Sequence, residues 1–411
     1  MQTNLAEFIR HTPEGQEAAG ILGKCVHCGF CTATCPTYQL LGDELDGPRG
    51  RIYLIKQVLE GVRPTEKTQL HLDRCLTCRN CETTCPSGVL YGRLVDIGRK
   101  VVEEQVARPL GARVVRTALK AGLTSPLFGP AMRLGQMARP LLPASLKAKV
   151  PAPQDAGRTP GTPRPRKMLL LGGCVQPAMM PNVNAATLRV FDALGIELVV
   201  PPAAGCCGAI RYHLNDHDGG LRDARANIDA WWPHLEAGCE AIVMNASGCG
   251  AQVREYGHML RDDAAYAAKA QRVSELTKDV AELLPAMADA IKARLAEPLK
   301  GRVVFHSPCT LQHGQQVRGE VESLLAALGA EVAPVGESHF CCGSAGTYSV
   351  LQPELAYQLR DRRLGHLEAP APEVILSANI GCIAHLASGT QRPVQHWIEC
   401  LDGRLSAAAA R

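Results

Sequence analysis

Two copies of one cysteine pattern constrain this chain more than any other feature. Each copy reads C-x2-C-x2-C-x3-C-P, and the members are Cys25, Cys28, Cys31, Cys35 and Pro36, then Cys75, Cys78, Cys81, Cys85 and Pro86. Three cysteines at this spacing can wrap one tight loop around three iron atoms, and the proline turns the chain away after the fourth. The pattern is typical of segments that hold [4Fe-4S] clusters.

In paired runs of this kind, three thiolates of one run hold a cluster and the fourth crosses to the other cluster. The spacing therefore predicts two [4Fe-4S] clusters, one on Cys25, Cys28, Cys31 and Cys85, the other on Cys75, Cys78, Cys81 and Cys35. Zinc sites usually pair C-x2-4-C units across a longer gap, so the pattern disfavours zinc.

The alternative of disulfides would require an oxidising compartment. Glu7, Arg10 and Glu14 interrupt any apolar run that could serve as a signal peptide. No apolar stretch approaches the roughly 18–20 residues that span a bilayer. We therefore expect a cytoplasmic protein with reduced thiols. Its net charge of +4 gives no indication of nucleic-acid binding.

A basic, amphipathic segment covers residues 105–154, which contain no Asp or Glu. Its basic residues are Arg108, Arg113, Arg116, Lys120, Arg133, Arg139, Lys147 and Lys149, and apolar residues such as Leu110, Val114, Leu127, Leu134, Met137 and Leu141 lie between them. Such a segment can lie on an anionic membrane surface, here the cytoplasmic face of the inner membrane. Short helices packed on the chain's own domains or on a partner subunit are the other interpretation.

The 411 residues divide into four parts. Residues 1–105 form an α-helical domain with both cysteine runs, since Ile52, Ile55 and Val58 follow helical spacing between them. Residues 106–166 contain the basic segment and a Pro-rich linker. Residues 167–300 and 301–411 are two copies of one cysteine-rich repeat.

The repeats are recognised by their matching cysteines. Cys206-Cys207-Gly208 follows Cys174 at the same 32-residue distance at which Cys341-Cys342-Gly343 follows Cys309, and each repeat ends in a further cysteine, Cys249 or Cys382. Strands and helices alternate in both copies, which favours βαβ units on a parallel sheet. The predicted fold class is thus α/β, with a helical ferredoxin-type domain before two Rossmann-like repeats. The repeat cysteines fall at the carboxyl ends of strands, where such sheets bind ligands.

A ferredoxin-type domain followed by two Cys-Cys-Gly repeats resembles the glycolate oxidase iron–sulfur subunit family over nearly the whole chain. Related architectures occur in iron–sulfur subunits of anaerobic glycerol-3-phosphate dehydrogenase, lactate-utilisation proteins and heterodisulfide reductases. The stretches Gly23–Cys31 and Asp46–Arg51 look most like the glycolate oxidase branch. No G-x-G-x-x-G fingerprint follows the strand before Gly172-Gly173. The resemblance therefore implies that flavin-containing partner subunits oxidise glycolate to glyoxylate, and that this chain transfers electrons towards a quinone-type acceptor.

The repeats differ from heterodisulfide reductases, which have a fifth cysteine where Ala246 and Asn379 stand here. Four cysteines per repeat suffice for an ordinary cubane, so the repeats can hold one or two further iron–sulfur clusters. Buried apolar packing is the other account of these cysteines, and it fits Cys239 and Cys400 best. His27, His306, His313 and His339 lie near cysteines in the sequence, and His339 is the one that we retain as a ligand or proton donor. Arg49, Arg51, Arg74, Arg79 and Arg93 can raise cluster potentials by offsetting thiolate charge.

Overall fold

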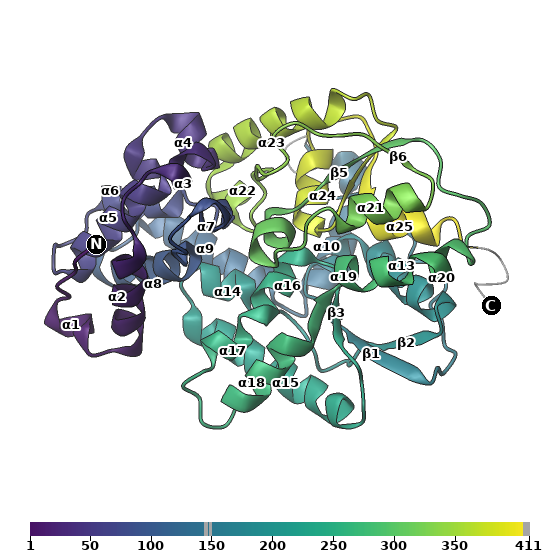
Figure 1. Cartoon of the computed structure of the whole chain (residues 1–411), viewed down its shortest axis with the longest axis horizontal. Coiled ribbons are helices and arrows are strands. Elements are labelled where there is room, and N and C mark those ends of the chain that lie inside the picture. The colour runs from purple at the N-terminus through teal and green to yellow at the C-terminus, as the bar shows by residue number, and fades with distance from the viewer. Residues whose placement is uncertain (144–146, 148–149, 406–411) are drawn as a thin grey trace. The chain divides into compact units, whose positions relative to one another are not determined.

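The computed structural model describes residues 1–143, 147 and 150–405. Lys149 of the basic segment lies outside the described residues. The chain forms two compact units, the first made of Met1–Thr117, His213–Asn215 and His339–Arg363, and the second of Ala118–Tyr212, Asp216–Ser338 and Leu364–Arg411 (Figure 1). The first unit therefore contains a segment of the second cysteine-rich repeat.

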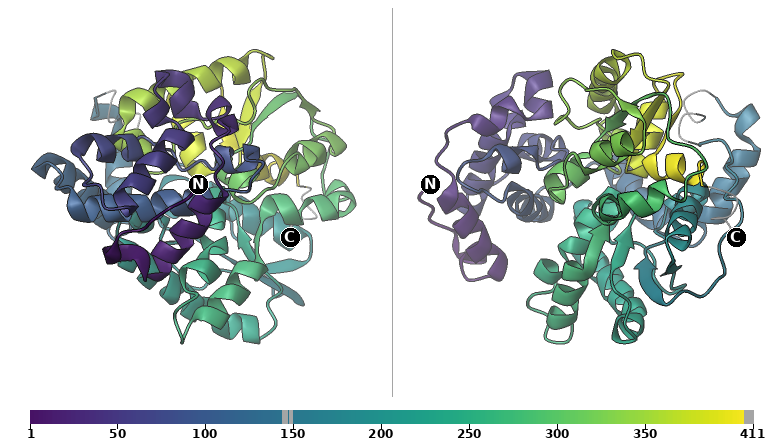
Figure 2. Two further views of the ribbon diagram at one scale, coloured as in Figure 1. Left: turned by 60° about the vertical axis from the view of Figure 1, so that its left-hand side comes forward. Right: turned by 45° about the vertical axis from the view of Figure 1, so that its right-hand side comes forward.

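The first unit is helical, as the sequence predicts (Figure 2). Its elements are α1 (Glu7–Arg10), α2 (Pro13–Lys24), α3 (Phe30–Ala33), α4 (Pro36–Leu41), η1 (Glu44–Asp46), α5 (Pro48–Leu59), α6 (Glu66–Asp73), α7 (Asn80–Thr84), α8 (Tyr91–Gln105), the first part of α9 (Leu110–Leu123), α22 (Tyr348–Leu351) and the first part of α23 (Pro353–Glu368). Ile55 of α5 packs on α8 at Gly98, where a Cβ would come within 2.6 Å of the Ile55 side chain. Glycine at this position allows α5 and α8 to approach closely.

Two four-stranded sheets, both parallel, form the second unit. The first has the order β2-β1-β3-β4 and the second the order β6-β5-β7-β8. The strands are β1 (Arg166–Leu170), β2 (Ile196–Val199), β3 (Ile242–Met244), β4 (Thr277–Asp279), β5 (Arg302–His306), β6 (Glu331–Val332), β7 (Val374–Ser377) and β8 (Val394–His396). The identical order confirms the predicted duplication and the Rossmann-like layers. Each sheet also gains a fourth strand, β4 or β8, that the sequence pattern does not predict.

Helices connect and flank these strands. They are α10 (Phe128–Met137), η2 (Arg139–Leu141), α12 (Gln176–Met179), α13 (Pro181–Ala193), α14 (Ala209–His213), α15 (His217–Glu236), α16 (Ser247–Arg254), α17 (Tyr256–Met259), α18 (Ala267–Leu276), α19 (Val280–Leu283), η3 (Pro285–Met287), α20 (Ala288–Lys292), η4 (Thr310–Gly314), α21 (Glu320–Ala327), α24 (Ile380–Ala387) and α25 (Trp397–Asp402). Among the described residues, no helix is long and apolar enough to cross a membrane.

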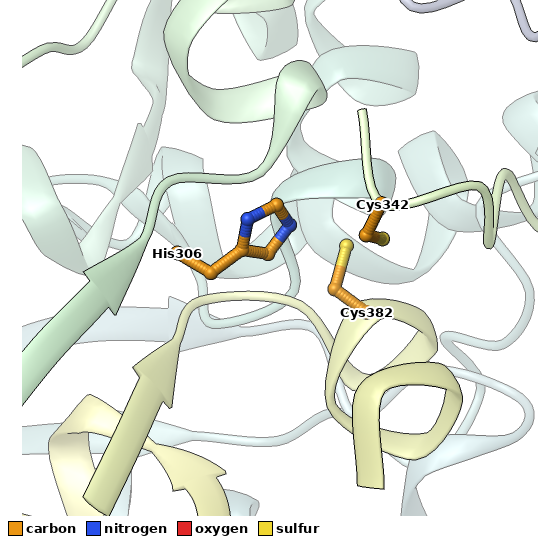
Figure 3. Close-up of side chains that lie close together, drawn as sticks. All are labelled: His306, Cys342 and Cys382. Carbon is orange, nitrogen blue, oxygen red and sulfur yellow. The ribbon is translucent and has the colours of Figure 1, made fainter. Parts of the chain in front are cut away.

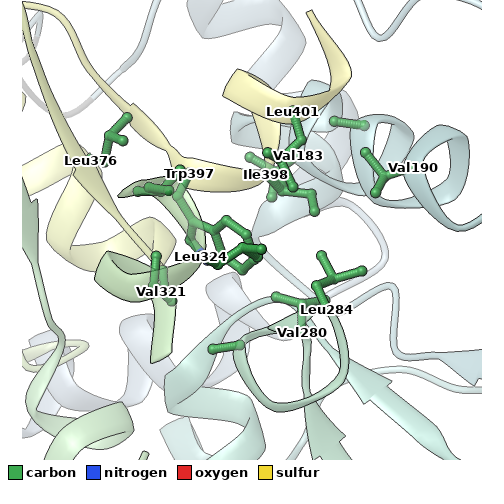
Figure 4. Close-up of a cluster of buried hydrophobic side chains, with 14 of the residues drawn as sticks. Val183, Val190, Val280, Leu284, Val321, Leu324, Leu376, Trp397, Ile398 and Leu401 are labelled. Carbon is green, nitrogen blue, oxygen red and sulfur yellow. The ribbon is translucent and has the colours of Figure 1, made fainter. Parts of the chain in front are cut away.

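The two repeats exchange the helices that follow their fourth strands. Helix α25 of the second repeat packs on α13 of the first, and α19 of the first repeat packs on α21 of the second. Figure 4 shows the resulting core, in which Ile398 and Leu401 lie beside Val183 and Val190. Arg189 on α13 forms an ion pair with Asp402 on α25 at 2.7 Å. One apolar core therefore runs through both repeats.

Candidate metal centres

The first predicted cluster site is a cavity in the helical unit. Cys25, Cys28, Cys31 and Cys85 line this solvent-open cavity, and Cys81 also lines it. The structure thus brings the fourth cysteine of the second run to the first three of the first run. The lining therefore contains the four cysteines predicted for the first cluster, together with Cys81 of the set predicted for the second.

The second set of thiols also lies together. Burial raises the pKa of the Cys81 thiol well above its ordinary value, and the nearby thiolates of Cys78, Cys75 and Cys35 raise it further. These are the four cysteines predicted for the second cluster. Three of these thiols are buried and Cys78 is partly exposed. Buried thiols stay protonated unless a cation stabilises the thiolates, so this donor set fits an iron–sulfur cluster.

The backbone of both cysteine loops adopts the same left-handed turns. His27 and Gly29 have φ of 56° and 84°, and the equivalent Thr77 and Arg79 have φ of 52° and 58°. Non-glycine residues rarely adopt such angles, and their strain persists only where surrounding structure requires it. The Thr77 N–H donates to Cys75 Sγ at 3.4 Å, so at least one of these turns aims an amide at a sulfur.

A buried ion pair supports the second site. Arg51, with 1% of its side chain exposed, contacts Asp46 Oδ1 at 3.3 Å and donates to the backbone carbonyl of His71 at 2.7 Å. Arg74 binds the other Asp46 oxygen at 2.8 Å. The sequence singles out both arginines but not Asp46, the residue that holds them. The only sequence signal for Asp46 is its position at the start of the Asp46–Arg51 stretch.

The first repeat brings its four cysteines together. Cys206 accepts hydrogen bonds from the Cys174 and Cys207 thiols, which lower its pKa, and Cys207 is in turn hydrogen-bonded to Cys249. Cys174 follows β1, the Cys206-Cys207 pair follows β2, and Cys249 lies in the first turn of α16 after β3. The carboxyl ends of three adjacent parallel strands therefore supply a four-thiol donor set.

The backbone of the Cys-Cys-Gly loop requires glycine at Gly208. Its φ is +85°, and a Cβ there would lie 2.7 Å from the carbonyl oxygen of Gly220 on α15. Its N–H donates to Cys206 Sγ at 3.4 Å. The equivalent Gly343 has φ of +87°, faces the Ala356 carbonyl oxygen in the same way, and donates to Cys341 Sγ at 3.4 Å.

Two further residues, which the sequence does not indicate, fix this loop. Asn227 Nδ2 donates to the Cys206 carbonyl at 2.7 Å, and its Oδ1 accepts from the Gly205 N–H at 2.8 Å. The Tyr256 hydroxyl donates to the Cys207 carbonyl at 2.9 Å. Both residues are fully buried, so they hold the cysteine pair from within the protein.

The four cysteines of the second repeat are divided between the two units, two in each. Cys309 and Cys382 lie after β5 and β7 in the second unit, whereas Cys341 and Cys342 lie in the His339–Arg363 segment of the first. Within the first unit, the Tyr348 hydroxyl donates to the Arg74 carbonyl at 3.1 Å. Burial raises the pKa of Tyr348, and the thiolates of Cys75 and Cys341 both raise it further, which places Tyr348 near both cysteines.

His306 lies beside Cys382, one of the four cysteines of the second repeat. Its ring nitrogen and Cys382 Sγ lie within 4.8 Å of each other, at the ends of β5 and β7. Figure 3 shows the side chains of His306 and Cys382 at these strand ends. The sequence instead favours His339, whose backbone carbonyl accepts a hydrogen bond from Asn80 Nδ2 at 3.0 Å.

Comparisons with known proteins agree with this architecture. The sequence model of the 4Fe-4S dicluster domain matches residues 21–89, and that of the cysteine-rich domain matches residues 168–254 and 303–387. The chain is 56% identical to the glycolate oxidase iron–sulfur subunit of Escherichia coli strain K12, covering 98% of this chain and 99% of that protein. It is 31% identical to a probable glycolate oxidase iron–sulfur subunit of Bacillus subtilis strain 168, covering 98% and 94%.

A more distant relative is lactate utilization protein A of Geobacillus thermodenitrificans, which is 28% identical and covers 58% of this chain and 99% of its own length. The near-full-length match to the Escherichia coli protein, together with the two domain types, settles the family. The chain belongs to the glycolate oxidase iron–sulfur subunit family.

Proposed function

We propose that this chain is the electron-transfer subunit of a complex that oxidises glycolate to glyoxylate on flavin-containing partner subunits. The observation that carries the proposal is the pair of crossed four-cysteine sets in a chain that matches a glycolate oxidase iron–sulfur subunit over nearly its full length. When bound, the clusters accept electrons one at a time and carry them towards a quinone-type acceptor.

The cysteines have defined roles in this proposal. Two [4Fe-4S] clusters bind to the crossed sets, which are Cys25, Cys28, Cys31 and Cys85, and Cys75, Cys78, Cys81 and Cys35. A further cluster binds Cys174, Cys206, Cys207 and Cys249. The equivalent set in the second repeat, which is the candidate for a fourth cluster, is Cys309, Cys341, Cys342 and Cys382. The proximity of Tyr348 to both Cys75 and Cys341 supports a path from the ferredoxin-type sites to the second repeat.

Residues 105–154 contact the cytoplasmic face of the inner membrane in this proposal. In the second unit, Leu127, Leu134, Met137 and Leu141 are between 67% and 89% exposed on and beside α10 and η2. These side chains do not pack on the chain's own core, which disfavours packing on its own domains and leaves a membrane surface or a partner subunit as the surface that covers them. Apolar side chains beside Arg133 and Arg139 match the chemistry of an anionic lipid surface.

Metal analysis and spectroscopy test the proposal directly. Anaerobically purified protein should contain at least twelve iron and twelve acid-labile sulfide atoms per chain, four for each of three clusters. Replacing Cys206 and Cys207 with serine should remove about four of each and one EPR signal, whereas Cys239→Ser should remove none. Eight irons in the wild type, unchanged by the double substitution, would leave the repeat cysteines structural.

The substrate is tested with the assembled complex. Glycolate added anaerobically should reduce the clusters, seen as loss of visible absorbance and gain of EPR signal. A complex that responds to lactate and not to glycolate would assign the chain to lactate oxidation, as the name of the Geobacillus relative suggests. Co-sedimentation with anionic vesicles tests the membrane contact, and it should weaken as salt screens the basic side chains.

A further inference from the structure

Tyr91 lies between the two crossed cysteine sets of the first unit. Its side chain is part of the lining of the cavity at the first set, together with Cys25 and Cys85. Burial raises the pKa of the Tyr91 phenol well above its ordinary value, and the nearby thiolates of Cys75 and Cys81 raise it further. These two cysteines belong to the second set. One side chain therefore borders both sites.

The hydroxyl of Tyr91 is directed at the second set. Only 3% of the residue is exposed, and the hydroxyl has no oxygen or nitrogen partner among residues 1–143, 147 and 150–405. The group that it meets is the sulfur of Cys75, with which it is hydrogen-bonded. A thiolate can only accept, and a phenol with its ordinary pKa of about 10 holds its proton at neutral pH. The Tyr91 O–H therefore donates to Cys75 Sγ.

The second cysteine run itself positions Tyr91. Tyr91 is the first residue of α8, and the next N–H, that of Gly92, donates to Glu82 Oε1 at 2.5 Å. Glu82 lies on α7 directly after Cys81. A Cβ at Gly92 would lie 2.8 Å from Arg79 Nε, so glycine allows α8 to begin close to this loop. The start of α8 is thus anchored to the loop that carries the thiols.

Cys75 has further stabilising contacts from buried groups. The Thr77 N–H donates to its sulfur at 3.4 Å, and Arg99, which is 8% exposed, donates to its carbonyl at 2.6 Å. Burial lowers the pKa of Arg51, but the thiolate of Cys75 and its anionic neighbours raise it by more, which places this guanidinium near Cys75. The Tyr91 hydroxyl therefore belongs to a set of fixed donors and positive charges around one cysteine.

The first set has a different environment. The arginine in its cavity lining is Arg49, whose side chain is 37% exposed and ion-paired with Glu44 at 2.6 Å. Cys28 of this set is exposed to solvent. Water therefore acts on the first site, whereas fixed buried groups act on the second.

We propose that Tyr91 raises the midpoint potential of the second cluster, and not that of the first, by donating its hydroxyl hydrogen bond to Cys75 Sγ. The inference deepens the function proposed above and rests on it. Reduction adds one electron to a cluster, so its sulfurs become stronger acceptors, and a fixed donor stabilises the reduced form more than the oxidised form. The hydrogen bond therefore makes the second cluster the better acceptor of electrons.

EPR-monitored redox titration of the anaerobically purified full-length chain tests this role. In Tyr91→Phe, the ratio of reduced to oxidised second cluster at a fixed potential should fall about tenfold, the effect of one hydrogen bond to a charged group. For a one-electron couple this equals a shift of about 59 mV to a more negative potential. Tyr53→Phe removes an exposed phenol that lies edge-on to His27, and as the matched control it should shift neither cluster.

Two further measurements distinguish the hydrogen bond from a structural role of the ring. Electron–nuclear double resonance of the reduced second cluster should show one fewer exchangeable proton in Tyr91→Phe than in the wild type. Replacing Tyr91 with 3-fluorotyrosine, whose phenol is a stronger acid and thus a stronger donor, should shift the potential to a more positive value. Cys28→Ser and Cys78→Ser identify the signals of the first and second cluster, because each changes a ligand of one.

The expected pattern is specific to one cluster and one atom. An unchanged potential in Tyr91→Phe, equal shifts of both clusters, or a negative shift with 3-fluorotyrosine would overturn the assignment. The 3-fluorotyrosine variant keeps the ring and the hydroxyl, so it decides the question if Tyr91→Phe loses iron.

The same preparations separate this inference from the proposed function. If glycolate reduces the clusters of the complex but Tyr91→Phe leaves both potentials unchanged, the electron-transfer role stands and only the role of Tyr91 fails. If glycolate does not reduce the clusters, the proposed function fails, whatever the potential of the second cluster.

Discussion

Asn379 joins the two repeats, because its Oδ1 accepts a hydrogen bond from the Gly248 N–H at 3.2 Å. Its Nδ2 is 3.6 Å from Cys382 Sγ, to which it donates. Gly248 directly precedes Cys249. The residue that replaces a fifth cysteine in the second repeat thus contacts the cysteine loops of both repeats.

Replacing Asn379 with alanine should affect both contacts. Loss of the hydrogen bond to Gly248 should lower the free energy of unfolding by about 1 kcal/mol. Loss of the N–H donor to Cys382 should shift the midpoint potential of a cluster bound there to a more negative value, because such donors stabilise the reduced cluster. EPR-monitored redox titration measures the shift. Asn182→Ala, which removes a bond to Glu399, is the control, and equal potentials in all three proteins would contradict the assignment.

Gly208→Ala and Gly343→Ala should both be strongly destabilising. Each substitution combines a left-handed backbone with a Cβ that would lie 2.7 Å or 2.5 Å from a carbonyl oxygen. Gly195→Ala is the matched control, since Gly195 also has a positive φ, +78°, but open space around it. We expect about 1 kcal/mol for the control, from backbone strain alone, and clearly more for the other two. Thermal unfolding measures this difference, and similar melting temperatures for all three variants would show that the close approach is unimportant.

Asp279 should make the protein less stable as pH rises. Burial raises the pKa of this carboxyl from 3.8 to about 7. The folded state therefore holds the proton more tightly, and the stability that this gives is complete below about pH 4 and is lost as pH rises through 7. Asp279→Asn cannot titrate, so the melting temperature of the wild type relative to this variant should fall between pH 5 and pH 8. The exposed Asp289→Asn variant is the control, and a constant difference for Asp279→Asn would refute the expectation.

His396 should have the opposite pH dependence. It caps α25, as Asp279 caps α19, and burial lowers its pKa from 6.5 to about 3. The unfolded chain takes up a proton below pH 6.5 that the folded chain excludes until about pH 3, so stability is lost as pH falls through this range, at about 1 kcal/mol per pH unit. His396→Asn keeps a capping side chain and should remove this loss, which unfolding curves at pH 5.5 and pH 7.5 will detect. A loss of stability in the variant equal to that of the wild type would contradict the role of His396.

The ion pair between Arg189 and Asp402 should contribute measurably to stability. Both side chains are at most 22% exposed, and the guanidinium makes two contacts with the carboxylate at 2.7 Å. A double-mutant cycle with Arg189→Ala and Asp402→Ala should give a coupling of about 1–2 kcal/mol. The exposed pair of Arg166 and Glu240 should give less than about 0.5 kcal/mol. Equal couplings for both pairs would mean that the exchanged helix α25 does not depend on this contact.

The sequence predicts the parts of the fold that repeat or alternate. The strands at Arg166–Leu170 and Arg302–His306 are apolar runs, and the equal distances between Cys174 and Cys206 and between Cys309 and Cys341 reveal the duplication. The fourth strands β4 and β8 escape prediction because neither is an apolar run: β4 is Thr277, Lys278 and Asp279, and β8 is Val394, Gln395 and His396.

The supporting residues of the sites are harder to predict. Gln176, Asn184 and Asn245, near Cys174, are hydrogen-bonded to one another, but they lie on different elements and no spacing rule connects them. The same is true of Asn227 and Tyr256, which meet only after α15 and α17 pack together. Cysteine spacing is visible in the sequence because one loop must surround one metal centre, whereas a hydrogen-bond network depends on the folded arrangement.

The exchange of α19 and α25 implies how such a chain could arise. If a single copy of the repeat exchanged the helix after its fourth strand in the same way, this helix required the groove of a second molecule. A symmetric homodimer satisfies this requirement, and fusion of its two genes would give the present chain. Once fused, the halves no longer had to be identical, and equivalent positions could diverge, as the acidic cap Asp279 and the imidazole cap His396 have done.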